Sequence, residues 1–341
     1  MLGSALPRGA RVVVSLPRWI GDALEVEPAV AALVEHGAAL TLDADGGVRQ
    51  LYRARFPELA FGEPDGARHD VAVLFRGSFR SAWRAWRAGV PRRAGLESDA
   101  RGWLLTDGAR PALERGAVPL GLGRARAWPR RLPRSVAAEA VELVGWLGVT
   151  VRRRRPRFEA SPAARAAAEA HRGATLVNLG SRAGSAKGFP PEFAGRLVDA
   201  LVARGHRVVA VCAPQEHGVA AAALARATTP VPLVEPDLVG LLALFEVARV
   251  VVTPDGGARH MAAIAGAPRV VAFAPTDPRH SVPAGGALER AFTADIACSP
   301  CHAERCPLDG AEHLACWSTL DPENLADAAD SRASLRPCPP A

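Results

Sequence analysis

The sequence contains no long apolar run. No segment approaches the roughly 20 apolar residues that a bilayer-spanning helix requires, which excludes such a helix. Residues 1–11 lack the apolar core of a signal peptide. Six cysteines in 341 residues are too few for a secreted domain held together by disulfides. These absences predict a cytoplasmic protein whose stability comes from packed cores.

Lysine is almost absent. Of the 42 basic residues only Lys187 is a lysine, and the net charge is +7. Because the chain is also rich in alanine and glycine, its arginine content is typical of a GC-biased genome. The surplus of charge is therefore only a weak indication of an anionic partner. The arginines form no concentrated basic stripe beyond residues 152–157, so we expect no nucleic-acid binding.

Strand-like and helix-like segments alternate along the chain with short connections, which favours parallel sheets with helical crossovers. The expected strands are 11–16, 40–43, 71–75, 175–179, 207–212, 250–253 and 269–274, and the expected helices are 22–36, 79–88, 135–147, 191–204 and 258–265. The arginine- and proline-rich segment 152–162 interrupts this alternation. We therefore predict an α/β protein of two domains, residues 1–155 and 156–341, that binds ligands beyond the carboxyl ends of its strands.

The turn after the first expected strand ends in Asp22. A carboxylate at this edge of the sheet is placed to accept a proton from an incoming hydroxyl group. The alternative is structural, because Asp22 and Glu25 have the spacing of an N-cap residue and its capping box. Spacing alone favours the cap.

The loop 180–188 has the composition of an anion-binding loop. Its small residues let backbone amides approach an anion, and Ser181 and Ser185 supply hydroxyl donors. The loop is not a Walker A motif, since that spacing of glycine and lysine is absent. It does hold the sole lysine, Lys187, whose compact ammonium group is not interchangeable with guanidinium. We therefore favour a functional role over an ordinary loop.

The segment 253–260 joins an expected strand to an expected helix. Gly256 and Gly257 at the helix start allow close approach of a diphosphate, and the free N–H groups favour negative charge. Asp255 is placed either to cap the helix or to bind a sugar hydroxyl. His260 is more often packed or exposed than a ligand-binding group at such a position.

Four cysteines lie close together in the sequence, at positions 298, 301, 306 and 316. This spacing slightly favours a closed structural site for zinc or iron, with Cys298, Cys301, Cys306 and Cys316 as ligands, over a set of reduced thiols.

Segment 78–89 is predicted to be an amphipathic helix. We expect its aromatic stripe of Phe79, Trp83 and Trp86 to face the core, and its arginines to be solvated or to bind an anionic acceptor or a membrane surface.

Taken together, these motifs resemble glycosyltransferase family nine, the ADP-heptose:lipopolysaccharide heptosyltransferases, and within it the second heptosyltransferase. The similarity covers about residues 11–330. It is carried by PRWIGD at 17–22, FRGSFRSA at 75–82 with GVPRRAGL at 89–96, GSRAGSAKGFP at 180–190, VVTPDGGARHMAA at 251–263 and CSPCHAERCPL at 298–308. The chain departs from the family at Gly188 and Phe189, where arginine and tryptophan are usual, and at Pro254, where asparagine is common.

The resemblance implies a GT-B fold of two Rossmann-like domains facing a central cleft, and an inverting transfer that needs no metal. It implies ADP-heptose as donor, bound by the second domain, and a lipid-linked lipopolysaccharide core as acceptor, bound by the first at the cytoplasmic face of the inner membrane. On matching positions, Asp22 is the general base and Lys187 stabilises the leaving diphosphate. The other implied donor-site residues are Ser181, Ser185, Glu216, Asp255, Gly256, Gly257 and His260, and the acceptor-site residues are Arg18, Arg80 and Arg93.

Two alternatives remain at this point. In the first, the chain is a transferase or epimerase of the same fold that uses another nucleotide sugar. In the second, it is a non-catalytic relative organised by a metal bound to its cysteines. The presence of both Asp22 and Lys187 argues against the non-catalytic relative.

Overall fold

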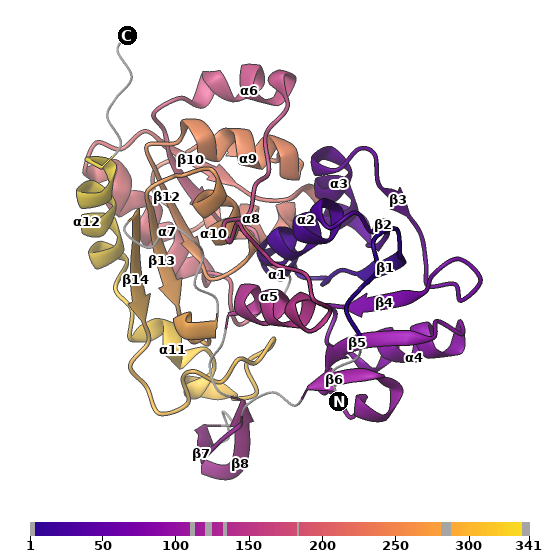
Figure 1. Ribbon diagram of the computed structural model, residues 1–341. Helices are drawn as coiled ribbons and strands as arrows, with labels where there is room; N and C mark the ends of the chain where they lie inside the picture. The colour runs from indigo at the N-terminus through magenta and orange to yellow at the C-terminus, as the bar shows by residue number, and fades with distance from the viewer. Residues whose placement is uncertain are drawn as a thin grey trace. The chain divides into compact units, whose positions relative to one another are not determined.

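The computed structural model describes residues 4–109, 113–119, 125–131, 135–182, 184–280 and 288–335. The chain folds into two compact units, and the main division between them falls between Phe158 and Glu159. Each unit contains one six-stranded parallel sheet, drawn in Figure 1. A further two-stranded sheet pairs β7 (Leu113–Pro119) with β8 (Ala125–Arg131), which the sequence pattern did not predict. Among the described residues no helix is long and apolar enough to cross a membrane.

The first unit is built on a sheet with strand order β3-β2-β1-β4-β5-β6. Its strands are β1 (Arg11–Ser15), β2 (Ala39–Asp43), β3 (Ala60–Phe61), β4 (Val71–Leu74), β5 (Arg92–Leu96) and β6 (Asp107–Ala109). Its helices are α1 (Ile20–Glu25), α2 (Glu27–Glu35), α3 (Gly46–Arg55), α4 (Phe79–Arg87), the 3₁₀ helix η1 (Gly102–Leu104) and α5 (Val136–Trp146). The central strand is apolar on both faces, as expected for a parallel strand covered on both sides: Val12, Val13 and Val14 are all buried.

The second unit has strand order β11-β10-β9-β12-β13-β14. Its strands are β9 (Thr175–Asn178), β10 (Val208–Val211), β11 (Leu233–Val234), β12 (Val250–Pro254), β13 (Arg269–Phe273) and β14 (Glu289–Thr293). Its helices are α6 (Pro162–Ala168), α7 (Pro191–Ala203), α8 (His217–Leu224), α9 (Leu238–Val247), α10 (Gly257–Ile264), α11 (Ala315–Ser318) and α12 (Pro322–Ala333), with short 3₁₀ helices at Glu169–His171, Pro214–Glu216, Pro278–His280 and Gly310–Glu312. In the core, α7 packs against α12.

Both sheets change direction at one point. In the first, the chain moves outward from β1 through β2 and β3, and then returns to place β4 on the other side of β1. In the second, β12 returns in the same way to the free side of β9. At such a switch point the loops that follow the two adjacent strands leave a crevice at their carboxyl ends, where ligands of open α/β sheets bind.

The single helix expected over residues 22–36 is wrong in two respects. The structure begins it at Ile20 and divides it into α1 and α2 at Val26. Pro28, in the first turn of α2, explains the division, because proline has no N–H to donate to the preceding turn and its ring clashes there. The helix therefore starts earlier than the charge pattern predicted, and Asp22 lies inside its first turn.

A buried carboxylate ties the first unit together. Glu27 is fully buried, and its side chain accepts hydrogen bonds from Arg153 at 2.8 Å and Arg55 at 3.1 Å. It also accepts one from the backbone N–H of Arg157 at 3.0 Å. One side chain thus joins α2, α3 and the segment after α5, three parts of the unit that are distant in sequence.

We expect Glu27→Gln to lower the free energy of unfolding by about 3 kcal/mol, because it leaves half-buried guanidinium groups without their counter-charge. Chemical denaturation measures this change. The matched control is Glu169→Gln, which removes one partner of the exposed pair Glu169–Arg172. That change should cost less than about 1 kcal/mol. If the two variants lost equal amounts of unfolding free energy, the role of Glu27 in joining α2, α3 and the segment after α5 would be contradicted.

Candidate functional site

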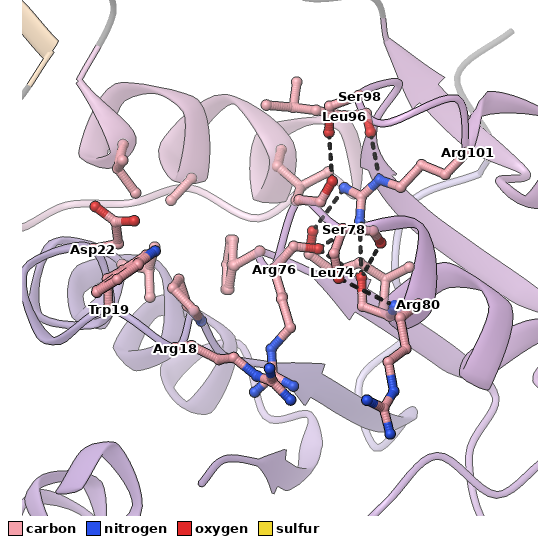
Figure 2. A pocket seen from close by; sticks show the side chains of 18 of the residues that line it. Arg18, Trp19, Asp22, Leu74, Arg76, Ser78, Arg80, Leu96, Ser98 and Arg101 are labelled. Atoms are coloured by element: carbon pink, nitrogen blue, oxygen red, sulfur yellow. Dashed lines mark hydrogen bonds between the residues drawn. The ribbon is translucent and has the colours of Figure 1, made fainter. Parts of the chain in front are cut away.

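The first unit contains a cavity of about 850 Å³ at its switch point. Its walls come from the loop after β1, the loop after β4, the start of α4 and residues of α5. Figure 2 shows the lining residues Arg18, Asp22 and Arg80. Five arginines and four carboxylates are among the described lining residues. A cavity of this size suits a ligand as large as an oligosaccharide segment, and its polar walls suit a charged ligand.

Asp22 lies on the wall of this cavity and is half-buried. The capping alternative is wrong, because the N-cap of α1 is Trp19 and no side chain makes a capping hydrogen bond there. The carboxylate instead belongs to the first helical turn, where the helix dipole stabilises negative charge. A second carboxylate, Glu139 of α5, lines the same cavity, and nothing in its sequence context marked it.

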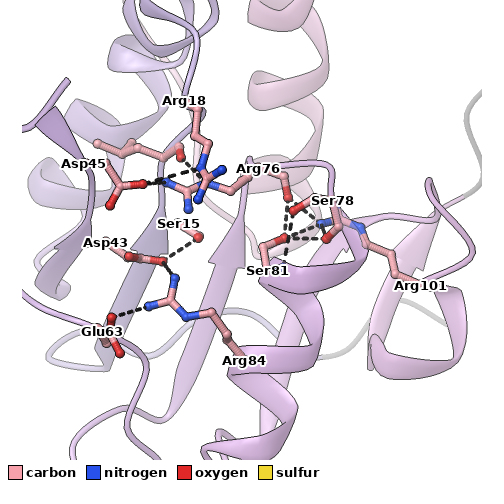
Figure 3. A network of polar contacts seen from close by, with 11 residues as sticks. Ser15, Arg18, Asp43, Asp45, Glu63, Arg76, Ser78, Ser81, Arg84 and Arg101 are labelled. Carbon is pink, nitrogen blue, oxygen red and sulfur yellow. Dashed lines mark hydrogen bonds and ion pairs between the residues drawn. The ribbon is translucent and has the colours of Figure 1, made fainter. Parts of the chain in front are cut away.

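Two predicted acceptor-site arginines, Arg18 and Arg80, line the cavity. Arg76 joins them, with Arg18 and Arg76 both paired to Asp45, at 3.5 and 3.3 Å (Figure 3). Arg80 is exposed and has no ion-pair partner in the described part of the chain. The wall therefore carries guanidinium groups that are held in position at one side and unpaired at the other, an arrangement that suits carboxylate or phosphate groups.

A second ion-pair system lies beside the first. Arg84 of α4 bridges Asp43 at 3.3 Å and Glu63 at 2.9 Å, and Ser15 donates to Asp43 at 2.8 Å. Asp43 and Asp45, two positions apart in the chain, are therefore both paired with arginines. Arg84 is one of the arginines of segment 78–89 that were expected to be solvated or to bind an anionic partner, and it is instead paired with two carboxylates. Nothing in the sequence marked Arg76, although it lies in the segment 75–82.

Buried Arg101 holds the loop after β4 in place. Its guanidinium donates to the backbone carbonyls of Leu96, Arg76 and Ser78 and, at 3.0 Å, to the hydroxyl of Ser81. Burial lowers its pKa to about 10, so the group remains charged at neutral pH. Nothing in the sequence marks Arg101, because an arginine in a loop carries no signal of burial.

Arg93, the third predicted acceptor-site arginine, does not line the cavity. Its guanidinium donates to the carbonyls of Leu104 and Val90, both at 2.6 Å, and desolvation lowers its pKa. Its donors are therefore directed at the polypeptide rather than into the cavity. Arg93 thus holds the backbone near Val90 and Leu104, whereas Arg76 lines the wall of the cavity.

The expected orientation of α4 is wrong. Its aromatic stripe points outward, with Phe79 37%, Trp83 38% and Trp86 45% exposed. The small residues Ala82 and Ala85 pack on the sheet instead. Alanine allows a helix to approach a sheet closely, and the stripe then has no room on the inner side.

In the second unit, the predicted diphosphate loop follows β9. Ser185 accepts a hydrogen bond from the backbone N–H of Lys187 at 3.2 Å. Lys187 is half-buried, and its ammonium group has no ion-pair partner among the described residues. A Cβ atom on Gly188 would lie 2.2 Å from the Ser181 hydroxyl. A side chain at position 188 would therefore require Ser181 to shift from its place against this end of the loop.

The cysteine segment supports the same loop. Trp317 donates its indole N–H to the carbonyl of Ala186 at 3.0 Å, and the N–H of Ala186 donates to the carbonyl of Glu304 at 2.8 Å. Phe189 packs against Trp317 at a ring-centroid distance of 5.3 Å. The position of Lys187 thus depends on residues more than 100 positions further along the chain.

The helix α10 begins after β12, the strand that pairs with β9, and the 180–188 loop follows β9. Gly256 is its N-cap and no side chain caps the helix there; a Cβ on Gly256 would meet nothing within 4 Å, so the space beside this glycine is open. Asp255 lies one residue before this N-cap, is buried and accepts a hydrogen bond from Arg259 at 3.2 Å. His260 is buried too, on α10, which begins at Gly257.

These loops share one edge of the sheet. β9 pairs in parallel with β12 on one side and with β10 on the other. Asn178, at the end of β9, donates to Thr253 at 3.3 Å. After β10, Glu216 approaches the 180–188 loop so closely that a Cβ on Gly180 would lie 2.3 Å from its carboxylate, and burial raises the pKa of Glu216. The predicted donor-site residues thus come from three adjacent strand ends.

The four cysteines do not form the predicted metal site. Cys298, Cys301, Cys306 and Cys316 line one small cavity of about 20 Å³. Nevertheless, no group of three or more histidine, cysteine or acidic side chains in the described chain is arranged to hold a metal ion. Burial raises the pKa of Cys316 to about 11 and raises that of Cys298. The reduced-thiol alternative fits the arrangement.

Comparisons with known proteins agree with this architecture. In fold, the chain is similar to E. coli ADP-heptose lipopolysaccharide heptosyltransferase II, with 21% identity over 95% of this chain and 99% of that chain and a TM-score of 0.67. It is similar to a family 9 glycosyl transferase from Veillonella parvula DSM 2008, with 16% identity, 96% and 98% coverage and a TM-score of 0.69. It is also similar to E. coli heptosyltransferase WaaC with ADP, with 16% identity, 94% and 99% coverage and a TM-score of 0.63.

The structural likeness confirms the GT-B fold. A search of curated protein sequences finds no match. The profile of glycosyltransferase family 9 (heptosyltransferase), by contrast, matches residues 65–312, well over half of the chain. That stretch includes the loop after β4, the 180–188 loop and the start of α10. The protein therefore belongs to glycosyltransferase family 9 and is a glycosyltransferase of the heptosyltransferase type.

Proposed function

We propose that this protein transfers heptose from ADP-heptose to the lipid-linked core of lipopolysaccharide, with inversion at the anomeric carbon. The observation that carries the proposal is the placement of Asp22 on the wall of an arginine-lined cavity at the switch point of the first sheet. Support for an ADP-sugar donor comes from similar folds solved with ADP and with ADP-2-deoxy-2-fluoro heptose.

The acceptor half of the reaction belongs to the first unit. The Asp22 carboxylate takes the proton of the acceptor hydroxyl as its oxygen attacks the anomeric carbon, opposite the departing ADP. General-base assistance of this kind contributes about 10²–10⁴-fold to the rate. Arg18, Arg76 and Arg80 hold the anionic groups of the core sugars, because their guanidinium groups line the cavity that contains Asp22.

The donor half belongs to the second unit. Ser181, Ser185 and Lys187 bind the diphosphate, and the amides at Gly256–Gly257 face it at the positive end of α10. Charge that develops on the β-phosphate as the bond breaks is stabilised by the Lys187 ammonium group. Glu216 lies near the nucleoside, and the buried residues Asp255 and His260 line the donor site.

The test is a transfer assay with ADP-heptose and truncated lipopolysaccharide cores, read by the mass of the product. A gain of one heptose supports the proposal. A folded protein that binds ADP and adds no heptose to any core contradicts it.

Replacing the base tests its role directly. We expect Asp22→Asn to lower kcat by about 10²–10⁴-fold, because the amide cannot accept a proton. Its effect on stability should stay within about 1 kcal/mol, the worth of a first-turn charge. The matched control is Glu192→Gln, which removes the first-turn carboxylate of α7 and should leave kcat unchanged. Retained turnover in Asp22→Asn would rule out the base assignment.

The sole lysine provides a second test. We expect Lys187→Ala to lower kcat by about 10²–10³-fold and to weaken ADP binding, because it removes the positive charge facing the leaving group. Lys187→Arg should recover only part of the rate, since the guanidinium group differs in shape and hydration. Arg182→Ala is the control: it lies in the same loop but is exposed and paired with Glu304. Full activity in Lys187→Ala would contradict the role of Lys187.

The geometry of the loop gives a third test. The methyl group of Gly188→Ala would displace Ser181, so the donor KM should rise by about tenfold or more. Gly218→Ala, at a helical glycine with open space around its Cβ position, should leave the KM unchanged. An unchanged donor KM in Gly188→Ala would show that Ser181 does not contact the donor.

A further inference from the structure

We propose that four exposed aromatic side chains, Phe79, Trp83, Trp86 and Trp103 (the aromatic patch), dock this protein onto the headgroup region of a bilayer that contains anionic phospholipid. The aromatic patch lies on the outer face of α4 and on η1. The proposal names the surface through which the enzyme meets its lipid-linked acceptor, and in that respect it rests on the proposed function.

The aromatic patch is continuous. Phe79 and Trp83 have ring centroids 6.1 Å apart, and Trp83 and Trp86 lie 4.9 Å apart. Trp103, at 65% exposure, lies 6.2 Å from Phe79 and 6.3 Å from Trp86, so it closes the group. These four residues include most of the large hydrophobic side chains that the described chain exposes. Contiguous exposed apolar surface of this kind marks an interaction site.

The helix beneath the aromatic patch cannot turn it inward. Ser81, Ala82 and Ala85 occupy the inner side of α4, and Ser81 donates to the carbonyl of Arg76 at 2.7 Å. The N-terminus of α4 is fixed as well, because Phe79 donates its N–H to the carboxylate of Asp99 at 2.6 Å. The outward orientation of the aromatic rings is thus built into the packing of the unit.

Residue type and charge favour a lipid surface. Tryptophan is the residue enriched where membrane meets water, since its ring is apolar and its N–H is polar. Arg80 and Arg87, on the same helix, are exposed and have no ion-pair partner among the described residues. Exposed arginines attract anionic headgroups at close range. Asp99, at the edge of the aromatic patch, accepts the backbone N–H of Phe79 and so holds the start of α4.

The position of the aromatic patch relative to the cavity selects the bilayer over a protein partner. Trp83 is part of the aromatic patch and also lines the cavity. Arg80, the residue after Phe79 on α4, lines the cavity as well. A protein bound across the aromatic patch would cover residues at which an acceptor has to enter. A membrane surface is instead the medium that carries a lipid-linked acceptor, so contact there brings the acceptor's sugars to the cavity that holds Asp22.

The experiment measures binding of the full-length protein to vesicles by co-sedimentation. The vesicles contain phosphatidylethanolamine with phosphatidylglycerol, and vesicles of phosphatidylcholine alone serve for comparison. We expect binding to the anionic vesicles that weakens in high salt. The double variant Trp86→Ser/Trp103→Ser should bind them at least about tenfold more weakly, because the apolar contact is lost. Arg87→Gln should weaken binding about fivefold, and only to anionic vesicles. Trp86, Trp103 and Arg87 do not line the cavity.

Matched controls are Leu335→Ser, another exposed apolar side chain, and Arg196→Gln, an exposed arginine of the second unit. Neither should change vesicle binding. Two results would overturn the proposal: wild-type protein that does not bind anionic vesicles, or Trp86→Ser/Trp103→Ser that binds them like wild type. A wild-type dimer that becomes a monomer in the double variant, without vesicle binding, would assign the aromatic patch to a second copy instead.

Activity separates this proposal from the proposed function. With a de-acylated, water-soluble core acceptor, the double variant should match wild type, which also shows that it is folded. With the same core embedded in anionic vesicles, its kcat/KM should fall with its vesicle binding. Absence of transfer by wild type on both acceptors would contradict the proposed function and leave the vesicle-binding result standing.

Discussion

The parallel pairing of β1 with β4, and of β9 with β12, is the constraint on which both candidate sites depend. In each pair, the connections that follow the two strands run in opposite directions. They therefore leave a crevice between the carboxyl ends of the two strands. Asp22 and Arg76 follow the first pair, and Lys187 and Gly256 follow the second. Chemistry-bearing residues that are distant in sequence therefore meet because a backbone hydrogen-bond pattern requires it.

Arginine serves two different purposes in this chain. Arg101 and Arg93 direct their donors at backbone carbonyls and thereby hold loops, whereas Arg80 and Arg87 are exposed. The guanidinium group suits the first purpose because it presents five donors in a rigid plane and remains charged even when partly desolvated. In a protein with one lysine, abundance of arginine is thus no guide to ligand binding. Only the direction of the donors separates the supporting arginines from those available to a ligand.

Helix α4 shows why an amphipathic pattern is insufficient. The periodicity of Phe79, Trp83 and Trp86 correctly predicts a helix with one aromatic face. It does not say which face packs, because burying alanine at close approach and burying tryptophan at greater distance both satisfy the pattern. Ala82 and Ala85 share one core cluster with Val13, Ala72 and Leu104, and the aromatic rings are exposed. The four cysteines are a similar case: their spacing allowed a metal site, but a shared cavity does not by itself provide ligand geometry.

The sequence by itself determined the alternating α/β pattern, the two sheets, and the short segments that carry the family, since hydrophobic periodicity and glycine placement act locally. It also determined that Asp22, Lys187 and Gly256 follow strands, which brings them to sheet edges. The tertiary structure alone decided that Asp22 lies in a helical turn rather than at its cap, that Arg93 turns away from the cavity while Arg76 lines it, and that Ser181 lies where a side chain at position 188 would displace it. These outcomes depend on contacts between residues far apart in the chain or on packing space, which no local pattern encodes.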